Sequence, residues 1–235
     1  MKALRLRPTS AMAIYAHPDD ADVAAGGVLA QWASEGTQVH LVVICKGDKG
    51  SHSLDRPAGV VSATRHEELQ RAAKILGASS ITTLERPDGA VTNDEELRAE
   101  LVGLVRKYRP DVVLGPDPTA VFFGGVYVNH RDHREAGWAI LDAVAPAAAM
   151  PLYFPEMGPT HQVELLLLSG THEPDVVIDV SSVIEVKVGA VLAHASQLEG
   201  DDQVIRDVVM GRAEQAGRPL GLAFAEAFRS VELSF

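Results

Sequence analysis

The sequence AMAIYAHPDD at residues 11–20 passes directly from apolar side chains to one histidine and two aspartates. The run at residues 11–16 is short and continuously apolar, which predicts a buried β-strand. The proline that follows His17 restricts the backbone, so His17, Asp19 and Asp20 leave the end of this strand in a defined arrangement. This stretch therefore predicts a central strand of the fold and the first half of a polar site.

Strand-like runs alternate with helical patterns along the rest of the chain. Further strands are predicted at residues 39–45, 81–84, 111–114, 163–168 and 176–180, and helices at about 23–35, 60–76, 94–108, 131–144, 182–198 and 202–215. Such alternation predicts the α/β class, with a mostly parallel sheet in a Rossmann-like three-layer sandwich. We expect residues 1–235 to form a single domain, with its site at the carboxyl ends of the strands.

A second polar cluster, NHRDH at residues 129–133, lies at the start of the helix predicted at 131–144. His130 and His133 are three residues apart and can share one helical face. Two histidines and a carboxylate form a common catalytic zinc set, which leaves one position open for water. Either cluster alone could be a capped turn. Both follow predicted strands of one sheet, which favours a metal centre with a second carboxylate as general base.

Several function classes are disfavoured by the sequence. It contains no Walker, dinucleotide-binding or serine-hydrolase motif. A net charge of −11 repels phosphate backbones, so we expect no nucleic-acid partner. The single cysteine, Cys45, cannot form an internal disulfide. We find no signal peptide and no stretch long enough for a membrane span, and we expect a cytoplasmic enzyme.

Seven short motifs lie along the chain. They are AHPDD at 16–20 (followed by glycines at 26 and 27), RHEE at 65–68, PDG at 87–89, RPD at 109–111, HRDH at 130–133, HASQ at 194–197 and AEAF at 225–228. Together they resemble the PIG-L, or LmbE-like, deacetylases, and the resemblance spans nearly the whole chain. It implies a zinc-dependent enzyme that removes an acetyl group from an N-acetylglucosamine-type amino sugar, releasing acetate and a free amine.

The resemblance also implies roles for residues of the first motif. His17 and Asp20 would ligate the zinc together with His133 of the fifth motif. Asp19 would be the general base that activates the attacking water. Iron(II) is an alternative to zinc, because two histidines and one carboxylate suit either cation.

The remaining roles concern the intermediate and the substrate. His130 would be the charged partner of the tetrahedral intermediate and the acid for the departing amine, and Asp132 would orient His130. The residues that would contact the substrate are Arg65, Asp88 and Gln197.

Two positions depart from the family pattern. Many members carry a glutamate after the two aspartates, where this chain has Ala21 and then Asp22. Mycothiol-type members also carry a tyrosine two residues before the first histidine of the H-x-D-H motif, where this chain has Val128 with Tyr127 adjacent. These departures put in doubt a contact around the metal and a tyrosine contribution to the oxyanion hole.

Two other functions stay open. The chain could be an amidase of thiol-conjugated amino sugars, or a metal-binding module without catalysis. Family analogy suggests a homo-oligomer, a trimer or hexamer, and the expected partner is a small-molecule amino sugar.

Overall fold

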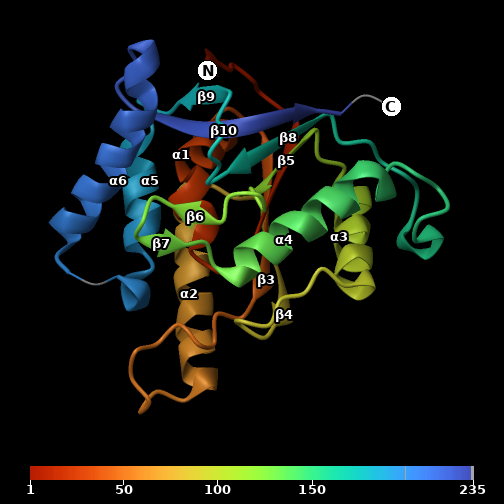
Figure 1. Cartoon of the computed structure of the whole chain (residues 1–235), viewed down its shortest axis with the longest axis horizontal. Coiled ribbons are helices and arrows are strands. Elements are labelled where there is room, and N and C mark those ends of the chain that lie inside the picture. Colours follow the sequence, from red (N-terminus) through yellow and green to blue (C-terminus); the bar gives the residue numbers. More distant parts are fainter. Residues whose placement is uncertain (199, 234–235) are drawn as a thin grey trace.

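In the computed structural model, which describes residues 1–198 and 200–233, an eight-stranded sheet forms the middle layer (Figure 1). The strand order is β1-β9-β10-β8-β5-β2-β3-β4. The strands are β1 (Lys2–Ala3), β2 (Ser10–Tyr15), β3 (Gln38–Cys45), β4 (Ser80–Arg86), β5 (Val112–Pro116), β8 (Leu165–Ser169), β9 (Val176–Asp179) and β10 (Ala225–Glu232). All neighbours pair in parallel except those of β10, which is antiparallel to both β8 and β9. The predicted α/β class with a mostly parallel sheet is confirmed.

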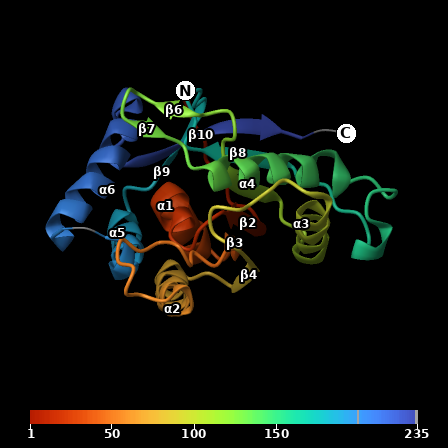
Figure 2. The same ribbon diagram turned by 60° about the horizontal axis from the view of Figure 1, so that its bottom comes forward.

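Helices cover both faces of this sheet (Figure 2). The helices are α1 (Asp20–Ser34), α2 (Ala58–Leu76), α3 (Glu95–Tyr108), α4 (Arg131–Asp142), α5 (Ile184–Leu192) and α6 (Asp202–Gly217). One apolar core joins α1, α2 and α5 to the sheet, and the other joins α3 and α4 to the opposite face. Helix α6 packs on α5 through a smaller apolar cluster and also contacts β10.

Strand β2 shows why an apolar run here becomes a central strand. Ala11 and Ala13 contribute to the core under α1, whereas Met12 and Ile14 contribute to the core under α3 and α4. Because successive side chains point to opposite faces, a strand buried on both sides needs a continuous apolar sequence. The strand ends where His17 begins the polar cluster, at the carboxyl edge of the sheet.

The first turn of α1 follows directly from the polar cluster. The helix begins at Asp20, three residues before the predicted start, and the Asp20 carboxylate accepts a hydrogen bond from the His17 amide at 2.7 Å. Farther along, Gly27 lies where a Cβ atom would come within 2.8 Å of Val180. A glycine therefore allows α1 to approach the sheet closely.

Strand β10 was not predicted as a strand. Its Glu226 is buried and accepts hydrogen bonds from the Gly27 and Val28 amides, at 2.9 and 2.8 Å. Lys187 of α5 donates to the same carboxylate. Glu226 therefore joins the sheet to two helices, and the AEAF motif has a structural role.

A further segment differs from the prediction. The helix predicted to reach residue 198 ends at Leu192, and a short 3₁₀ turn, Ala195–Gln197, follows it. His194 and Gln197 make contacts with distant segments, and these contacts take the place of further helical turns. The loop at 116–128 contains a small hairpin of β6 (Phe122–Phe123) and β7 (Tyr127–Val128). Among residues 1–198 and 200–233, no helix has the length and apolar character needed to cross a membrane.

Candidate metal and catalytic site

Three predicted metal ligands meet where β2 ends and α4 begins. His17 Nδ1 lies 3.2 Å from His133 Nε2. The two Asp20 carboxylate oxygens lie 3.3 Å from His17 Nδ1 and 3.1 Å from His133 Nε2. A tetrahedral cation with bonds of about 2.0–2.1 Å separates neighbouring ligand atoms by roughly 3.3 Å. The three side chains therefore fit around one divalent cation.

The second nitrogen of each histidine in this triangle has its own partner. His17 Nε2 lies 3.2 Å from Asp88 Oδ1, and His133 Nδ1 lies 3.1 Å from Asn129 Oδ1. Metal-binding histidines usually hold their outer nitrogen in this way, which fixes the ring orientation. Both rings are therefore oriented for coordination through the nitrogens that face Asp20.

His130 lies next to the triangle. Ligand atoms of His17, His130 and His133 all lie within 4.8 Å of one another, as do those of His17, Asp88, His130 and Asp132. We favour the triangle with Asp20 because each of its three interatomic distances is 3.3 Å or less. His130 is also more exposed than the other two histidines, so its free edge faces the solvent side of the site.

Asp132, in the first turn of α4, is fully buried next to His17. Its carboxylate accepts hydrogen bonds from the Gly89 amide at 2.6 Å and the Val91 amide at 3.2 Å, and lies 3.5 Å from His17 Nε2. Its own amide donates to His130 Nδ1 at 3.2 Å. In a neutral His130 ring this contact leaves the proton on Nε2.

Arg65 reaches the site from α2. It is 3% exposed, and its Nη2 donates to Asp19 Oδ1 at 2.7 Å. Its Nη1 donates to the Gly47 carbonyl at 3.2 Å and lies 3.9 Å from Asp88 Oδ2. The guanidinium therefore holds the carboxylate of Asp19 and the loop at Gly47 in place.

Acidic groups dominate the electrostatics around His17. Burial opposes a charge on the ring, but Asp20, Asp132 and Asp88 raise the pKa of His17 far above its usual value. Burial also opposes ionisation of Asp20, yet His133 and His17 hold its pKa well below the usual range. Asp132 behaves similarly, since burial is outweighed by hydrogen bonds from His17 and a backbone amide, and its pKa falls to about 2. Without a cation, the cluster therefore keeps its carboxylates ionised and a proton on His17.

The segment after α5 makes two contacts with residues next to the site. His194 Nε2 lies 2.8 Å from Asp22 Oδ2, and both side chains are buried. Gln197 Nε2 donates to the Gly50 carbonyl at 3.0 Å. Asp22, which is one methylene shorter than the glutamate of many family members, thus contacts His194. Gln197 holds the loop at Gly50, which lines the site.

Most of the predicted site residues border one cavity of about 420 Å³. Seven of them line it: His17, Asp19, Asp20, Arg65, Asp88, His130 and His133. Asp132 lies beneath His17, and Gln197 contacts the wall through Gly50. The sequence interpretation did not assign Asn129, although it directly precedes His130, or Lys49, which carries no motif signal. Lys49 and Tyr127 both line the cavity.

Comparison with known proteins identifies the family. A family model described as PIG-L, GlcNAc-PI de-N-acetylase, matches residues 12–144, which is more than half of the chain. The chain belongs to the PIG-L family. The resemblance seen in its motifs is therefore confirmed.

Relatives of this PIG-L protein cover most of its length. The diacetylchitobiose deacetylase of Thermococcus kodakarensis is 30% identical over 230 residues, covering 94% of this chain and 82% of the relative. The N,N'-diacetylchitobiose deacetylase structure from Pyrococcus horikoshii superposes with a TM-score of 0.87 at 26% identity, covering 96% of this chain and 84% of that one. GalB, the 4-carboxy-2-hydroxymuconate hydratase of Pseudomonas putida KT2440, has a TM-score of 0.79 at 24% identity, covering 97% and 98%. Since a hydratase shares the architecture, the fold alone does not fix the reaction.

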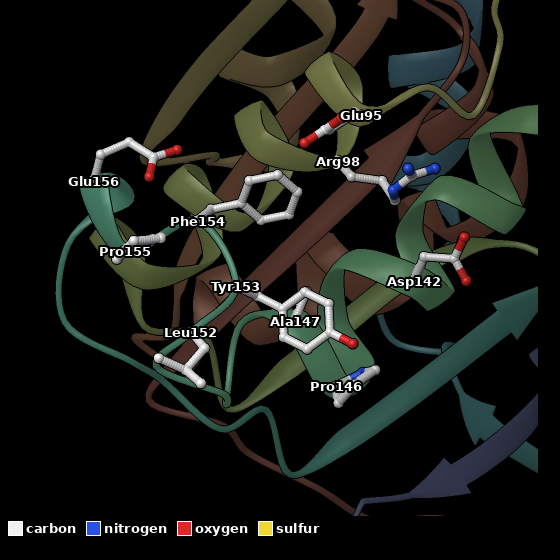
Figure 3. Close-up of a pocket in the computed structure, with 10 residues that line it drawn as sticks. All are labelled: Glu95, Arg98, Asp142, Pro146, Ala147, Leu152, Tyr153, Phe154, Pro155 and Glu156. Carbon is white, nitrogen blue, oxygen red and sulfur yellow. The ribbon is translucent and has the colours of Figure 1, made fainter.

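Another cavity of this PIG-L protein lies away from the metal ligands. Figure 3 shows its lining, which comes from α3, the end of α4 and the segment after it, and it measures about 560 Å³. Leu152, Tyr153 and Phe154 form one wall, and Arg98 and Asp142 lie across from them. None of the nine predicted site residues lines this cavity, so we do not assign the chemistry to it.

Proposed function

We propose that this protein is a zinc-dependent hydrolase that removes the acetyl group from an N-acetylglucosamine-type amino sugar. The observation that carries the proposal is the triangle of His17, Asp20 and His133, with the carboxylate of Asp19 beside it in the same cavity. Both deacetylases named above act on diacetylchitobiose by their names, and the family model describes a de-N-acetylase. These comparisons support an N-acetyl group on glucosamine as the target.

Asp19 is the group that we assign as general base. When bound, the cation would act as a Lewis acid that polarises the amide carbonyl and lowers the pKa of water. Asp19 removes a proton from the attacking water, whose oxygen forms a bond to the acyl carbon. Arg65 donates a hydrogen bond to the Asp19 carboxylate and holds it at the wall of the cavity. The C–N bond then breaks, and the same proton passes to the departing amine.

His130 is the group that we assign to the developing oxyanion. Asp132 donates its amide to His130 Nδ1, so the Nε2 edge carries the hydrogen-bond donor that faces the cavity. A fixed donor at this place stabilises charge that appears only in the transition state.

The sugar side of the cavity is rich in polar groups. Arg65, Asp88 and Lys49 line it, together with the phenol of Tyr127. Hydroxyl groups of a sugar can pair with all of these side chains. Arg65 and Gln197, which were predicted to contact the substrate, already contact Asp19 and Gly50. We therefore propose that Arg65 acts through Asp19, and we keep Asp88 and Gln197 as candidates for substrate recognition.

A direct test measures amine release from N,N'-diacetylchitobiose and from N-acetylglucosaminyl-inositol by the zinc-loaded protein. The Asp19→Asn variant should retain its metal and lose roughly 10²- to 10⁴-fold in kcat, the range for a general base. Asp55→Asn, in an exposed part of the loop before α2, is the matched control and should retain activity. Equal turnover by Asp19→Asn and the native protein would remove Asp19 from the role of base.

The same assay separates the alternatives. Faster hydrolysis of thiol-conjugated amino sugars than of the two acetylated sugars would favour the amidase function. Metal binding without amine release from any of these substrates would favour the non-catalytic module. Parallel loading with zinc and iron(II) compares the two cations, while the homo-oligomeric state and the cytoplasmic location stay predictions.

A further inference from the structure

A second cavity meets the first at the metal triangle. Asp19, Asp20 and His133 line both the 420 Å³ cavity and another of about 360 Å³ that opens between α1, α6 and the β6–β7 hairpin. We call this the second cavity, and its other walls include Tyr15, Val23, Ala24, Pro116, Phe123 and Ser169. An amide hydrolase must accommodate groups on both sides of the bond that it breaks. Two cavities that share Asp20 and His133 meet this requirement.

The walls of the second cavity are largely apolar. Val23 and Ala24 project from α1, Pro116 ends β5, and Phe123 belongs to the hairpin. Phe123 also packs against the rings of Tyr127 and His172, at 5.9 and 4.9 Å between centroids, which supports its position. These side chains offer contact to hydrocarbon rather than partners for hydroxyl groups.

Polar groups at the bottom of the second cavity are already paired with each other. The Tyr15 hydroxyl lies 2.9 Å from Ser169 Oγ, and Ser169 Oγ donates to the Gly115 carbonyl at 3.2 Å. The Asn129 amide donates to the Ala120 carbonyl at 2.8 Å, while its oxygen faces His133. A sugar would find few free partners here, whereas an alkyl chain leaves these hydrogen bonds intact.

The charged group on the wall does not alter this conclusion. Arg212 of α6 lines the second cavity but is exposed, so its guanidinium can stay in water while its methylene stem covers the opening. Val23, which is 41% exposed, lies at the same open side. The cavity therefore combines an apolar wall with polar groups that are paired among themselves, and its exposed side carries Val23 and Arg212.

The volume of the second cavity exceeds what an acetyl group needs. A methyl group takes up about as much space as a water molecule, which is roughly 30 Å³. The second cavity is about 360 Å³. Because this cavity is open to solvent on one side, an acyl chain longer than acetyl can extend along its apolar wall.

We propose that the second cavity binds the acyl chain of the substrate and admits saturated chains of at least four carbons. This inference rests on the proposed amide hydrolysis and concerns the acyl side of the same site. For an N-butanoyl sugar, the water oxygen bonds to the acyl carbon and the C–N bond breaks. Butanoate leaves, and the sugar amine takes up the proton.

The first test compares N-acetyl- and N-butanoylglucosamine glycosides as substrates of the zinc-loaded protein. We expect the kcat/KM for butanoyl to be at least equal to that for acetyl. If acetyl is hydrolysed and butanoyl falls below about 1% of that rate, the acyl assignment is wrong while the deacetylase function stands. If neither is hydrolysed, the proposed function fails, and the binding measurement described below decides the second cavity separately.

Two variants locate the effect in the second cavity. Ala24→Leu adds side-chain volume to its wall and should lower the butanoyl-to-acetyl ratio of kcat/KM about tenfold. Phe123→Ala widens the second cavity and should raise the hexanoyl-to-acetyl ratio of kcat/KM. The control is Ala63→Leu on α2, an equal change in a separate cavity that shares no metal ligand, and it should leave the ratio unchanged. An Ala24→Leu variant with an unaltered ratio would contradict the proposal.

Carboxylate binding gives a readout that does not depend on turnover. Each methylene transferred to an apolar site adds roughly fourfold in affinity. Butanoate should therefore bind the zinc-loaded protein about fifteenfold more tightly than acetate in calorimetric titrations, and Ala24→Leu should reduce this difference. Equal affinities for acetate and butanoate would overturn the assignment.

Discussion

Arg65 Nη2 donates a hydrogen bond to Asp19 Oδ1 at 2.7 Å, across 46 residues of sequence. Arg65 is almost completely buried, whereas 27% of the Asp19 side chain is exposed. The guanidinium of Arg65 therefore lies inside the protein, and the Asp19 carboxylate that it contacts lies at the wall of the substrate cavity. This relationship suggests that Arg65 acts on the reaction through Asp19.

Substitution of Arg65 should therefore affect kcat more than KM. Arg65→Ala releases the Asp19 carboxylate, and we expect kcat to fall about 10²-fold while KM changes by less than about threefold. Arg65→Lys retains the charge but loses the planar fork, so it should recover only part of the activity. Steady-state kinetics on an acetylated sugar measure both constants.

The control for this prediction lies on the same helix. Arg71 is mostly exposed. Among the described residues its one ion pair is with Glu67, at 3.9 Å. Arg71→Ala should leave both constants unchanged. An Arg65→Ala enzyme with raised KM and native kcat would instead make Arg65 a direct substrate contact.

The buried carboxylate of Glu226 should be important for stability. Glu226→Ala leaves the Gly27 and Val28 amides without their acceptor and Lys187 without its counter-charge, which should cost about 3–5 kcal/mol of the free energy of unfolding. Urea denaturation of the native protein and the variant measures this difference. Glu232→Ala, at the exposed end of the same strand, should change stability by less than about 0.5 kcal/mol.

A double variant distinguishes charge from packing at this position. Lys187→Met combined with Glu226→Gln removes both charges and retains side-chain volume. It should be more stable than Glu226→Ala, because no uncompensated charge stays buried. A double variant that is less stable than either single change would show that the ion pair itself stabilises the fold.

Metal binding should weaken as the pH falls. The surrounding carboxylates raise the pKa of His17 in the metal-free protein, so its ring carries a proton at neutral pH. A cation can bind His17 only after this proton leaves, and the affinity should fall about tenfold for each unit of pH decrease around neutrality. Calorimetry in buffers of different ionisation enthalpy should detect about one proton released per cation. A dissociation constant that is independent of pH between about 6 and 8 would contradict this assignment.

The raised pKa of His17 has the opposite pH effect on the stability of the metal-free protein, which should fall as the pH rises. A raised pKa in the folded state stabilises the fold below the ordinary pKa of histidine, about 6.5. This contribution of His17 is lost as the pH rises through the raised pKa. The native protein should therefore lose more stability between acidic and alkaline pH than His17→Gln does, when both are unfolded in urea without metal.

The sequence predicted the parallel core because local patterns determine it. The apolar run of β2 and the motifs that follow it place His17 and Asp20 at a strand end without any tertiary information. Strand β10 was missed because its burial depends on partners far away in the chain. The carboxylate of Glu226 is buried because it accepts hydrogen bonds from backbone amides of α1. No local periodicity marks such a residue as buried.

The end of α5 was missed for a related reason. Its sequence continues with helix-compatible residues, but His194 turns toward Asp22, which is 172 residues away in the chain. Lys49 and the second cavity were also beyond the sequence, because loops carry no periodic pattern. The candidate metal ligands could be proposed from the sequence because they belong to motifs, whereas the groups that shape the substrate space come from several elements.

The coordination of one divalent cation by His17, Asp20 and His133 is tested most directly by X-ray absorption at the zinc edge, combined with metal analysis. We predict one zinc per chain with two nitrogen ligands and one carboxylate oxygen at about 2.0–2.1 Å, and loss of the metal in His133→Ala. A native protein that binds no zinc, or a His133→Ala variant that retains zinc with an unchanged first shell, would contradict the assignment.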